Sequence, residues 1–159
     1  MQLIATLPAD YEAMQGAAEW RGYHIPQGGL EPFETLEMLV GWAGRLQAAQ
    51  GWGSWVAVQD GEVVASLAIK DPARAGVVYI GYAVAPAWRG RGVATRAVGL
   101  LLPILAGHGI TLVQAETALS NPASGRVMQK AGFARTGERL DPEDGPLEQW
   151  QRGIGSGVA

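Results

Sequence analysis

Residues 77–95 have the sequence VVYIGYAVAPAWRGRGVAT. The apolar, aromatic and β-branched residues at 77–84 predict a strand that ends before Pro86. An amphipathic pattern from about Gly90 to Ala106 predicts a helix. The turn between them carries two glycines and two arginines, and unpaired N–H groups and the helix dipole favour an anion there. By itself, this turn fits a phosphate site and equally a basic surface turn that starts a helix.

The composition excludes several classes of function for the chain. The chain has 159 residues, the size of one domain, with 48% hydrophobic residues and a net charge of −3. That charge argues against general nucleic-acid binding. Cysteine is absent, which excludes thiolate nucleophiles, and the histidines, His24 and His108, lie far apart, so we expect no metal site. The first residues lack a signal-peptide pattern and no apolar stretch reaches the ~18 residues of a membrane span, so we expect a cytoplasmic protein that needs neither membrane nor nucleic acid.

The hydrophobic patterns predict one α+β domain with the element order β-α-α-β-β-β-α-β-α-β-β. We expect helices at 8–20, 32–49, 90–106 and 122–131, with Asp10 as the N-cap of the first. A loop over 21–32 is expected between the first two helices. Strands are expected at 2–7, on both sides of Asp60-Gly61, at 77–84 and 110–119, and as a hairpin of 133–139 with 147–152. The buried face of the third helix is expected at Val93, Ala97, Leu100, Leu101 and Ile104.

Two well-known phosphate-binding folds also place a glycine-rich turn between a strand and a helix. A P-loop is excluded because the pattern GxxxxGK[ST] is absent. A dinucleotide-binding fold fits in part, since GRGVAT approaches GxGxxG and Glu116 stands near the usual offset of the ribose-binding acid. Against that fold, Thr95 replaces the final glycine, residues 86–89 separate the strand from the turn, and a hairpin precedes the unit.

A second segment separates these alternatives. Residues 121–133 have the sequence NPASGRVMQKAGF, and residues 89–94, RGRGVA, match the pattern [QR]xxGx[GA]. The pattern at residues 89–94 matches the signature of the GCN5-related N-acetyltransferases (GNAT). The segment at residues 121–133 resembles the Asn-x-x-Ser…Gly-Phe helix of their RimJ/RimL-like branch, which acetylates ribosomal-protein N-termini. The resemblance covers about residues 52–152. It implies the GNAT fold over residues 1–153, with a mixed, mostly antiparallel central sheet flanked by helices and splayed strands at the CoA site; residues 154–159 are expected to form a flexible tail.

The resemblance implies acetyl-CoA as the acyl donor. Val84 would pair with the pantetheine arm and Asn121 would hydrogen-bond it, while Arg89 and Arg126 would lie near the phosphates. The backbone N–H groups that would receive the pyrophosphate are those of Arg91, Gly92, Val93, Ala94 and Thr95. Each arginine has the ordinary alternative of a solvated surface residue, and Asn121 that of an N-cap.

The implied chemistry is direct acyl transfer, in which a base or a water chain takes the proton of the amine and an acid protonates the thiolate. Many relatives use a tyrosine for the acid, but Met128 stands at that position. Ser124 fits the serine of the branch and is expected near the thiol. Glu116 is the remaining acid that we expect as the base, although it also fits an exposed strand end.

The acceptor is expected between the segment after the first helix, the strand that contains Tyr82, and the last hairpin. Tyr82, Tyr23 and His24 are the expected acceptor-binding residues. The expected reaction acetylates a primary amine, with a protein N-terminus as the first acceptor and a polyamine or antibiotic as the alternative. A non-catalytic acyl-CoA-binding module is the alternative of another class, and the resemblance leaves open whether the domain forms a homodimer.

Overall fold

A nine-stranded mixed sheet runs through the part of the chain that the computed structural model describes, residues 1–30 and 33–155, with the backbone alone for 33–36. Seven of its strands lie in the order β1 (Gln2–Ala5), β4 (Ser54–Gln59), β5 (Glu62–Ile69), β6 (Val77–Val84), β7 (Leu112–Ala118), β9 (Gly145–Gly153) and β8 (Ala134–Asp141), and the two short strands β2 (Glu19–Trp20) and β3 (Tyr23–His24) lie off this path. Neighbouring strands in this order are antiparallel except β6 and β7. The expected mixed, mostly antiparallel sheet is therefore confirmed.

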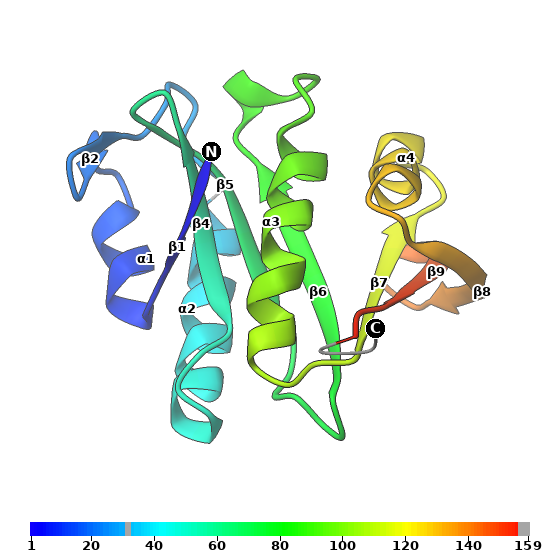
Figure 1. Ribbon diagram of the computed structural model, residues 1–159. Coiled ribbons are helices and arrows are strands. Elements are labelled where there is room, and N and C mark those ends of the chain that lie inside the picture. The colour runs from blue at the N-terminus through cyan, green and yellow to red at the C-terminus, as the bar shows by residue number, and fades with distance from the viewer. Residues whose placement is uncertain (31–32, 156–159) are drawn as a thin grey trace.

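Helices cover both faces of this sheet. Figure 1 shows α3 (Val93–Gly107) in front of the central strands and α2 (Phe33–Ala49) behind β4, while α4 (Pro122–Lys130) lies near β7. The strands β4 and β5 are buried along nearly their whole length because they lie between these helical layers. None of the described helices has the length and apolar character to span a bilayer.

The first helix is shorter than predicted. Helix α1 (Pro8–Met14) ends before Gly16, which has a φ of 68°, a conformation that suits glycine and cannot continue a right-handed helix. The residues expected to complete the helix and begin the following loop instead form two short strands, β2 (Glu19–Trp20) and β3 (Tyr23–His24). Strand β3 also pairs in parallel with the start of β5.

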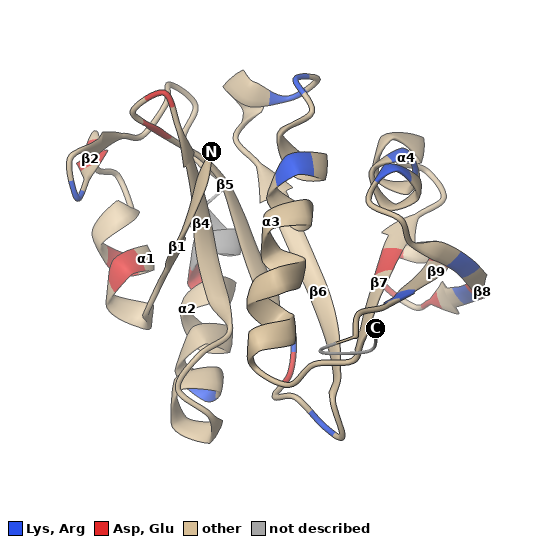
Figure 2. Ribbon diagram, in the orientation of Figure 1, with Lys and Arg blue, Asp and Glu red and all other residues tan. Residues whose placement is uncertain are grey.

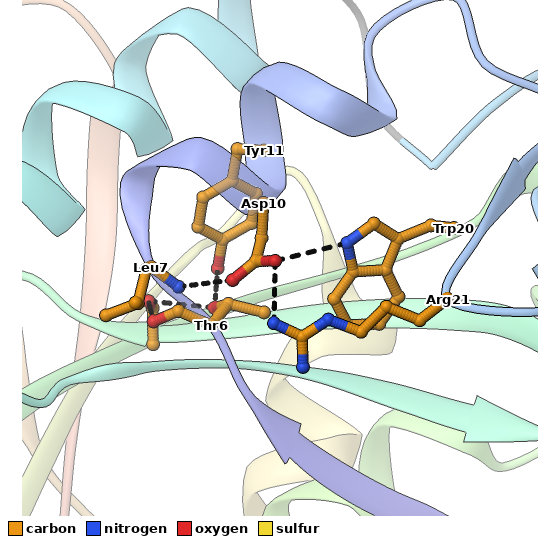
Figure 3. A network of polar contacts seen from close by, with 7 residues as sticks. Thr6, Leu7, Asp10, Tyr11, Trp20 and Arg21 are labelled. Atoms are coloured by element: carbon orange, nitrogen blue, oxygen red, sulfur yellow. Dashed lines mark hydrogen bonds and ion pairs between the residues drawn. The ribbon is translucent and has the colours of Figure 1, made fainter.

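Asp10 is not the N-cap that we predicted. It lies inside the first turn of α1, where its carboxylate accepts the N–H of Leu7 at 2.7 Å, as the third helical residue of a capping box does. The same carboxylate accepts the Trp20 indole N–H at 3.3 Å and an Arg21 N–H at 2.8 Å, as Figure 3 shows. Asp10 therefore ties the β2–β3 hairpin to α1.

A hydroxyl chain beside this network joins α1 to the sheet. The Thr6 hydroxyl lies 2.9 Å from the Tyr11 hydroxyl (Figure 3). It also lies 2.9 Å from the Ser54 hydroxyl. Thr6 and Ser54 are buried, and Tyr11 is fully buried. Buried hydroxyls that satisfy one another in this way fix the position of α1 against β1 and β4.

Helix α3 begins at Val93, three residues later than predicted, because Gly90 and Gly92 both have positive φ, 76° and 72°. Its buried face differs from the prediction in one main respect: Leu100 is 40% exposed. Residues spaced by four, from Val93 to Leu105, share a face with the buried Val98 and Leu102. Leu100 falls at the exposed edge of this face.

The residues in the turns set the geometry of the β4–β5 and β8–β9 hairpins. Asp60 and Gly61 have φ of 51° and 78°, so the predicted tight turn between β4 and β5 is confirmed. In the β8–β9 hairpin both strands extend further toward the turn than predicted, and the Asp141 carboxylate accepts the N–H groups of Glu143 and Asp144, each at 2.9 Å.

Strands β6 and β7 separate after a short parallel contact. They pair only from Val77–Tyr79 to Leu112–Gln114. Ala85 donates to Val64 and Tyr79 accepts from Lys70, and hydrogen bonds alternate along an antiparallel strand. The backbone groups of Tyr82 and Val84 therefore point away from β5 and toward the space that opens beside β7, which is the expected splay.

Candidate active site

A cleft of about 660 Å³ opens where β6 and β7 separate. It is lined by the end of β6, by the turn at 88–92, by the start of α3 and by one side of α4. Among the predicted site residues, it brings together Tyr82, Val84, Arg89, Gly92, Val93, Ala94, Thr95, Asn121, Ser124 and Arg126. Arg91, Glu116, Tyr23 and His24 do not line it.

The turn supplies backbone donors to one end of the cleft. It follows a short 3₁₀ helix, Pro86–Trp88, and leads directly into α3. Since Gly90 and Gly92 carry no side chain, the backbone stays accessible to a bound group. The N–H groups of the first turn of α3 have no partner within the helix, so this end of the cleft can hold an anion.

Basic side chains flank the same end. Arg89 lines the cleft from the turn, and Arg126 and Lys130 line it from α4. Figure 2 shows basic residues at the turn and on α4, and both of these segments line the cleft. Arg91 is directed elsewhere, because its guanidinium lies over the Trp88 ring at 4.9 Å from the centroid.

Asn121 occupies the N-cap position of α4 without capping it through its side chain. The side chain makes no cap hydrogen bond, while the Asn121 carbonyl accepts the N–H of Ser124 at 3.1 Å. Asn121 is exposed and lines the cleft. The N-cap alternative therefore does not account for the side chain of this cleft residue.

Tyr82 and Ser124 meet across the cleft. The Tyr82 hydroxyl donates to the Ser124 carbonyl at 3.4 Å. Burial raises the pKa of the Tyr82 phenol, and the hydrogen bond at Ser124 offsets this in part. Tyr82 therefore remains protonated throughout the neutral range, whereas Met128, which is fully buried, has no proton to donate.

Glu116 lies outside the cleft in an ion pair that the sequence did not indicate. Both oxygens of its carboxylate accept from the Arg139 guanidinium, one of them at 2.9 Å. This hydrogen bonding to Arg139 holds the pKa of Glu116 below its ordinary value. Arg139 is the partner of Glu116 that sequence reasoning missed, because 23 residues separate the two side chains and no local pattern links them.

Tyr23 and His24 lie on β3, beside the start of β5. The His24 side chain is 67% exposed and its Nδ1 lies 3.6 Å from a Glu19 carboxylate oxygen. The structure thus places both residues near the hairpin end of β5, and neither of them lines the cleft. Their expected role in acceptor binding stays a prediction.

The whole arrangement has a counterpart among known proteins. A family model described as the acetyltransferase (GNAT) family matches residues 17–133. The chain belongs to this family. Membership confirms the expected GNAT fold and the expected acetyl-CoA-dependent N-acetyltransferase activity. No curated protein matches the chain.

Solved GNAT structures resemble the chain over nearly its full length. The aminoglycoside acetyltransferase AAC(6')-Ib in complex with coenzyme A is 21% identical, with a TM-score of 0.68 over 96% of this chain and 94% of that chain. RimL, a ribosomal L7/L12 α-N-protein acetyltransferase in complex with coenzyme A, is 19% identical, with a TM-score of 0.70 over 96% and 93%. A chimera of the Vibrio cholerae spermidine N-acetyltransferase SpeG and hSSAT is 13% identical, with a TM-score of 0.70 over 94% and 93%. At these identities the likeness establishes the common fold.

Proposed function

We propose that this GNAT domain transfers the acetyl group of acetyl-CoA directly to a peptide N-terminus within a ternary complex. The observation that carries the proposal is the cleft that leads from the glycine-rich turn to Ser124 and Tyr82. An acyl-enzyme route through a thiol is excluded because the chain has no cysteine. The peptide acceptor follows from the Asn-x-x-Ser segment at 121–124, which is similar to the branch that acetylates ribosomal proteins.

The residues of the cleft fit CoA in its charge and hydrogen-bonding groups. The N–H groups at residues 91–95, together with Arg89 and Arg126, would bind the phosphates. The pantetheine arm carries amides, which need donors and acceptors. Tyr82 and Val84 offer backbone groups that point away from β5, and Asn121 offers a side-chain amide. The Val84 carbonyl accepts the Arg89 Nε–H at 3.4 Å, a contact that a bound pantetheine arm would replace.

Transfer requires a neutral amine and a proton for the departing thiolate. We assign the proton to the Ser124 hydroxyl, with Tyr82 next to it as a second protonated hydroxyl. The Arg139 pair lowers the pKa of Glu116, which weakens it as a proton acceptor. We therefore propose that water takes the amine proton.

The role of Ser124 is tested by Ser124→Ala. We expect kcat to fall about 100-fold because a positioned proton donor is lost, while the CoA dissociation constant changes by less than about twofold. Ser120→Ala, just before α4 and outside the cleft lining, is the matched control. Full turnover in the Ser124 variant would remove this residue from the reaction.

The acceptor is tested by thiol release from acetyl-CoA. We expect a peptide with a free N-terminus to release thiol and the same peptide with a blocked N-terminus not to. Spermidine and an aminoglycoside are included because the polyamine and aminoglycoside acetyltransferases above share the fold at similar TM-scores. Release with these amines alone would favour a small-molecule enzyme. CoA binding without release by any acceptor would favour a binding module.

A further inference from the structure

The end of the β4–β5 hairpin contacts the glycine-rich turn at two points. The Trp88 indole N–H donates to a Glu62 carboxylate oxygen at 2.5 Å. On the other strand, Gln59 accepts an N–H of Arg96 through its side-chain oxygen at 2.9 Å. Residues 59 and 62 are the last of β4 and the first of β5, so both contacts come from one tight turn.

Each contact continues to the middle of the turn. The Arg91 guanidinium lies over the Trp88 ring, and Arg96 donates a second N–H to the Arg91 carbonyl at 2.9 Å. Arg91 is therefore held by its side chain through Trp88 and by its backbone through Arg96. Both routes end at the β4–β5 hairpin.

Contacts of this kind restrict the conformations available to the glycine-rich turn. Gly90 and Gly92 adopt positive φ, and glycines have more accessible conformations than other residues when nothing holds them. A site that is already ordered before its ligand arrives binds more tightly, because less ordering accompanies binding. Trp88 is 8% exposed, and its buried indole N–H needs an acceptor.

The chemical nature of the acceptor is informative. A carboxylate near a site for phosphates repels the ligand, so charge alone disfavours Glu62 at this position. Its hydrogen bond to Trp88 gives it a compensating role. A glutamine would keep the acceptor oxygen without the negative charge.

We infer that Glu62 is a positioning residue that fixes Trp88, and through it the turn, in the conformation that accepts the CoA pyrophosphate. Gln59 supports the same turn through Arg96. The inference rests on the proposed CoA site and adds a residue that does not line it. It predicts weaker CoA binding for a neutral substitution of Glu62 that removes the acceptor oxygen, and no weakening for one that keeps it.

The experiment measures the CoA dissociation constant by calorimetry for Glu62→Leu and Glu62→Gln. Glu62→Leu should raise it about tenfold, equivalent to ~1.4 kcal/mol, because Trp88 loses its acceptor. Glu62→Gln should leave it unchanged or lower it. Asp60→Asn removes the same charge from the same hairpin end and should also leave it unchanged. Equal or tighter binding by Glu62→Leu would show a purely electrostatic role and overturn the inference.

A double-mutant cycle tests the route through Trp88. Trp88→Phe keeps the ring and removes the N–H donor, so it should raise the constant about as much as Glu62→Leu. The double variant should bind no more weakly than either single variant, since both remove one contact. Multiplied effects, about 100-fold in total, would contradict the inference. If the wild type itself fails to bind CoA, the proposed function falls and the inference with it, whereas normal wild-type binding with an unaffected Trp88→Phe overturns the inference alone.

Discussion

Gly92 stands where the glycine-rich turn becomes α3. Its φ of 72° lies in the left-handed region, and a Cβ there would meet Nη1 of Arg96 at 3.2 Å. The residue lines the cleft, so a side chain at this position adds bulk beside the site proposed for the pyrophosphate.

Gly92→Glu should raise the CoA dissociation constant at least about 100-fold, because it places bulk and negative charge at the phosphates. Calorimetric titration measures the constant. The control is Gly99→Glu, an exposed position within α3 where a Cβ meets nothing within 4 Å. Equal affinity in the Gly92 and Gly99 variants would exclude the turn as the pyrophosphate site.

Glu116 contributes to stability through its charge. Since Arg139 lowers the folded-state pKa of Glu116 below its ordinary value of 4.5, the ionised form stabilises the fold above that pH. Wild type should therefore exceed Glu116→Gln in unfolding free energy at pH 7. The difference should shrink as the pH falls from 4.5 through the lowered pKa. Urea unfolding between pH 7 and pH 3 measures it, and a difference that does not vary with pH would contradict the assignment to the ion pair.

Strand β6 is the element that links sheet and site. One of its edges pairs with β5 from Ile80 to Val84, while the other leaves β7 after Tyr79. A strand with an open edge offers unpaired donors and acceptors to an extended ligand. The same strand carries the Tyr82 hydroxyl toward α4.

CoA should change hydrogen exchange along β6 in an alternating pattern. The amides of Tyr82 and Val84 should exchange at least about tenfold more slowly when CoA is bound, because the pantetheine arm pairs with the open edge. Those of Gly81 and Ala83 already face β5 and serve as internal controls. Uniform protection of all four amides would indicate general stiffening, and no protection would exclude the strand-like pairing.

In the whole molecule, the sheet consists of two parts with a narrow junction. Only three residue pairs join β6 to β7, whereas β7 and β9 pair over seven. The cleft has walls from both sides of this junction, the turn and α3 on one and α4 on the other. A ligand in the cleft therefore connects the two parts.

CoA at 100 times its dissociation constant should raise the melting temperature by about 5–10 °C, which follows from ~2.7 kcal/mol of linkage in a domain of this size. Scanning calorimetry measures the shift. Gly92→Glu provides the control, because it should melt at an unchanged temperature when CoA is added. A shift of equal size in that variant would place the CoA contacts elsewhere.

The elements with strong local patterns were predictable from the sequence. The Asp60-Gly61 hairpin, β6 and α4 with Gly132 after its end follow from turn residues and periodicity. The N-terminal segment was not predicted correctly, because β2 and β3 are too short for a periodic signal. Their stability comes from Asp10 and from pairing with β5.

The sequence by itself determined the family, the glycine-rich turn and the residues that line the cleft from α4, since these depend on motifs whose members are neighbours along the chain. Tertiary structure alone decided the partners of the chemical groups: Arg139 for Glu116, Ser124 for Tyr82 and Glu62 for Trp88. These pairs are 23, 42 and 26 residues apart. Contacts at such separations depend on the order and register of the strands, which local patterns do not encode.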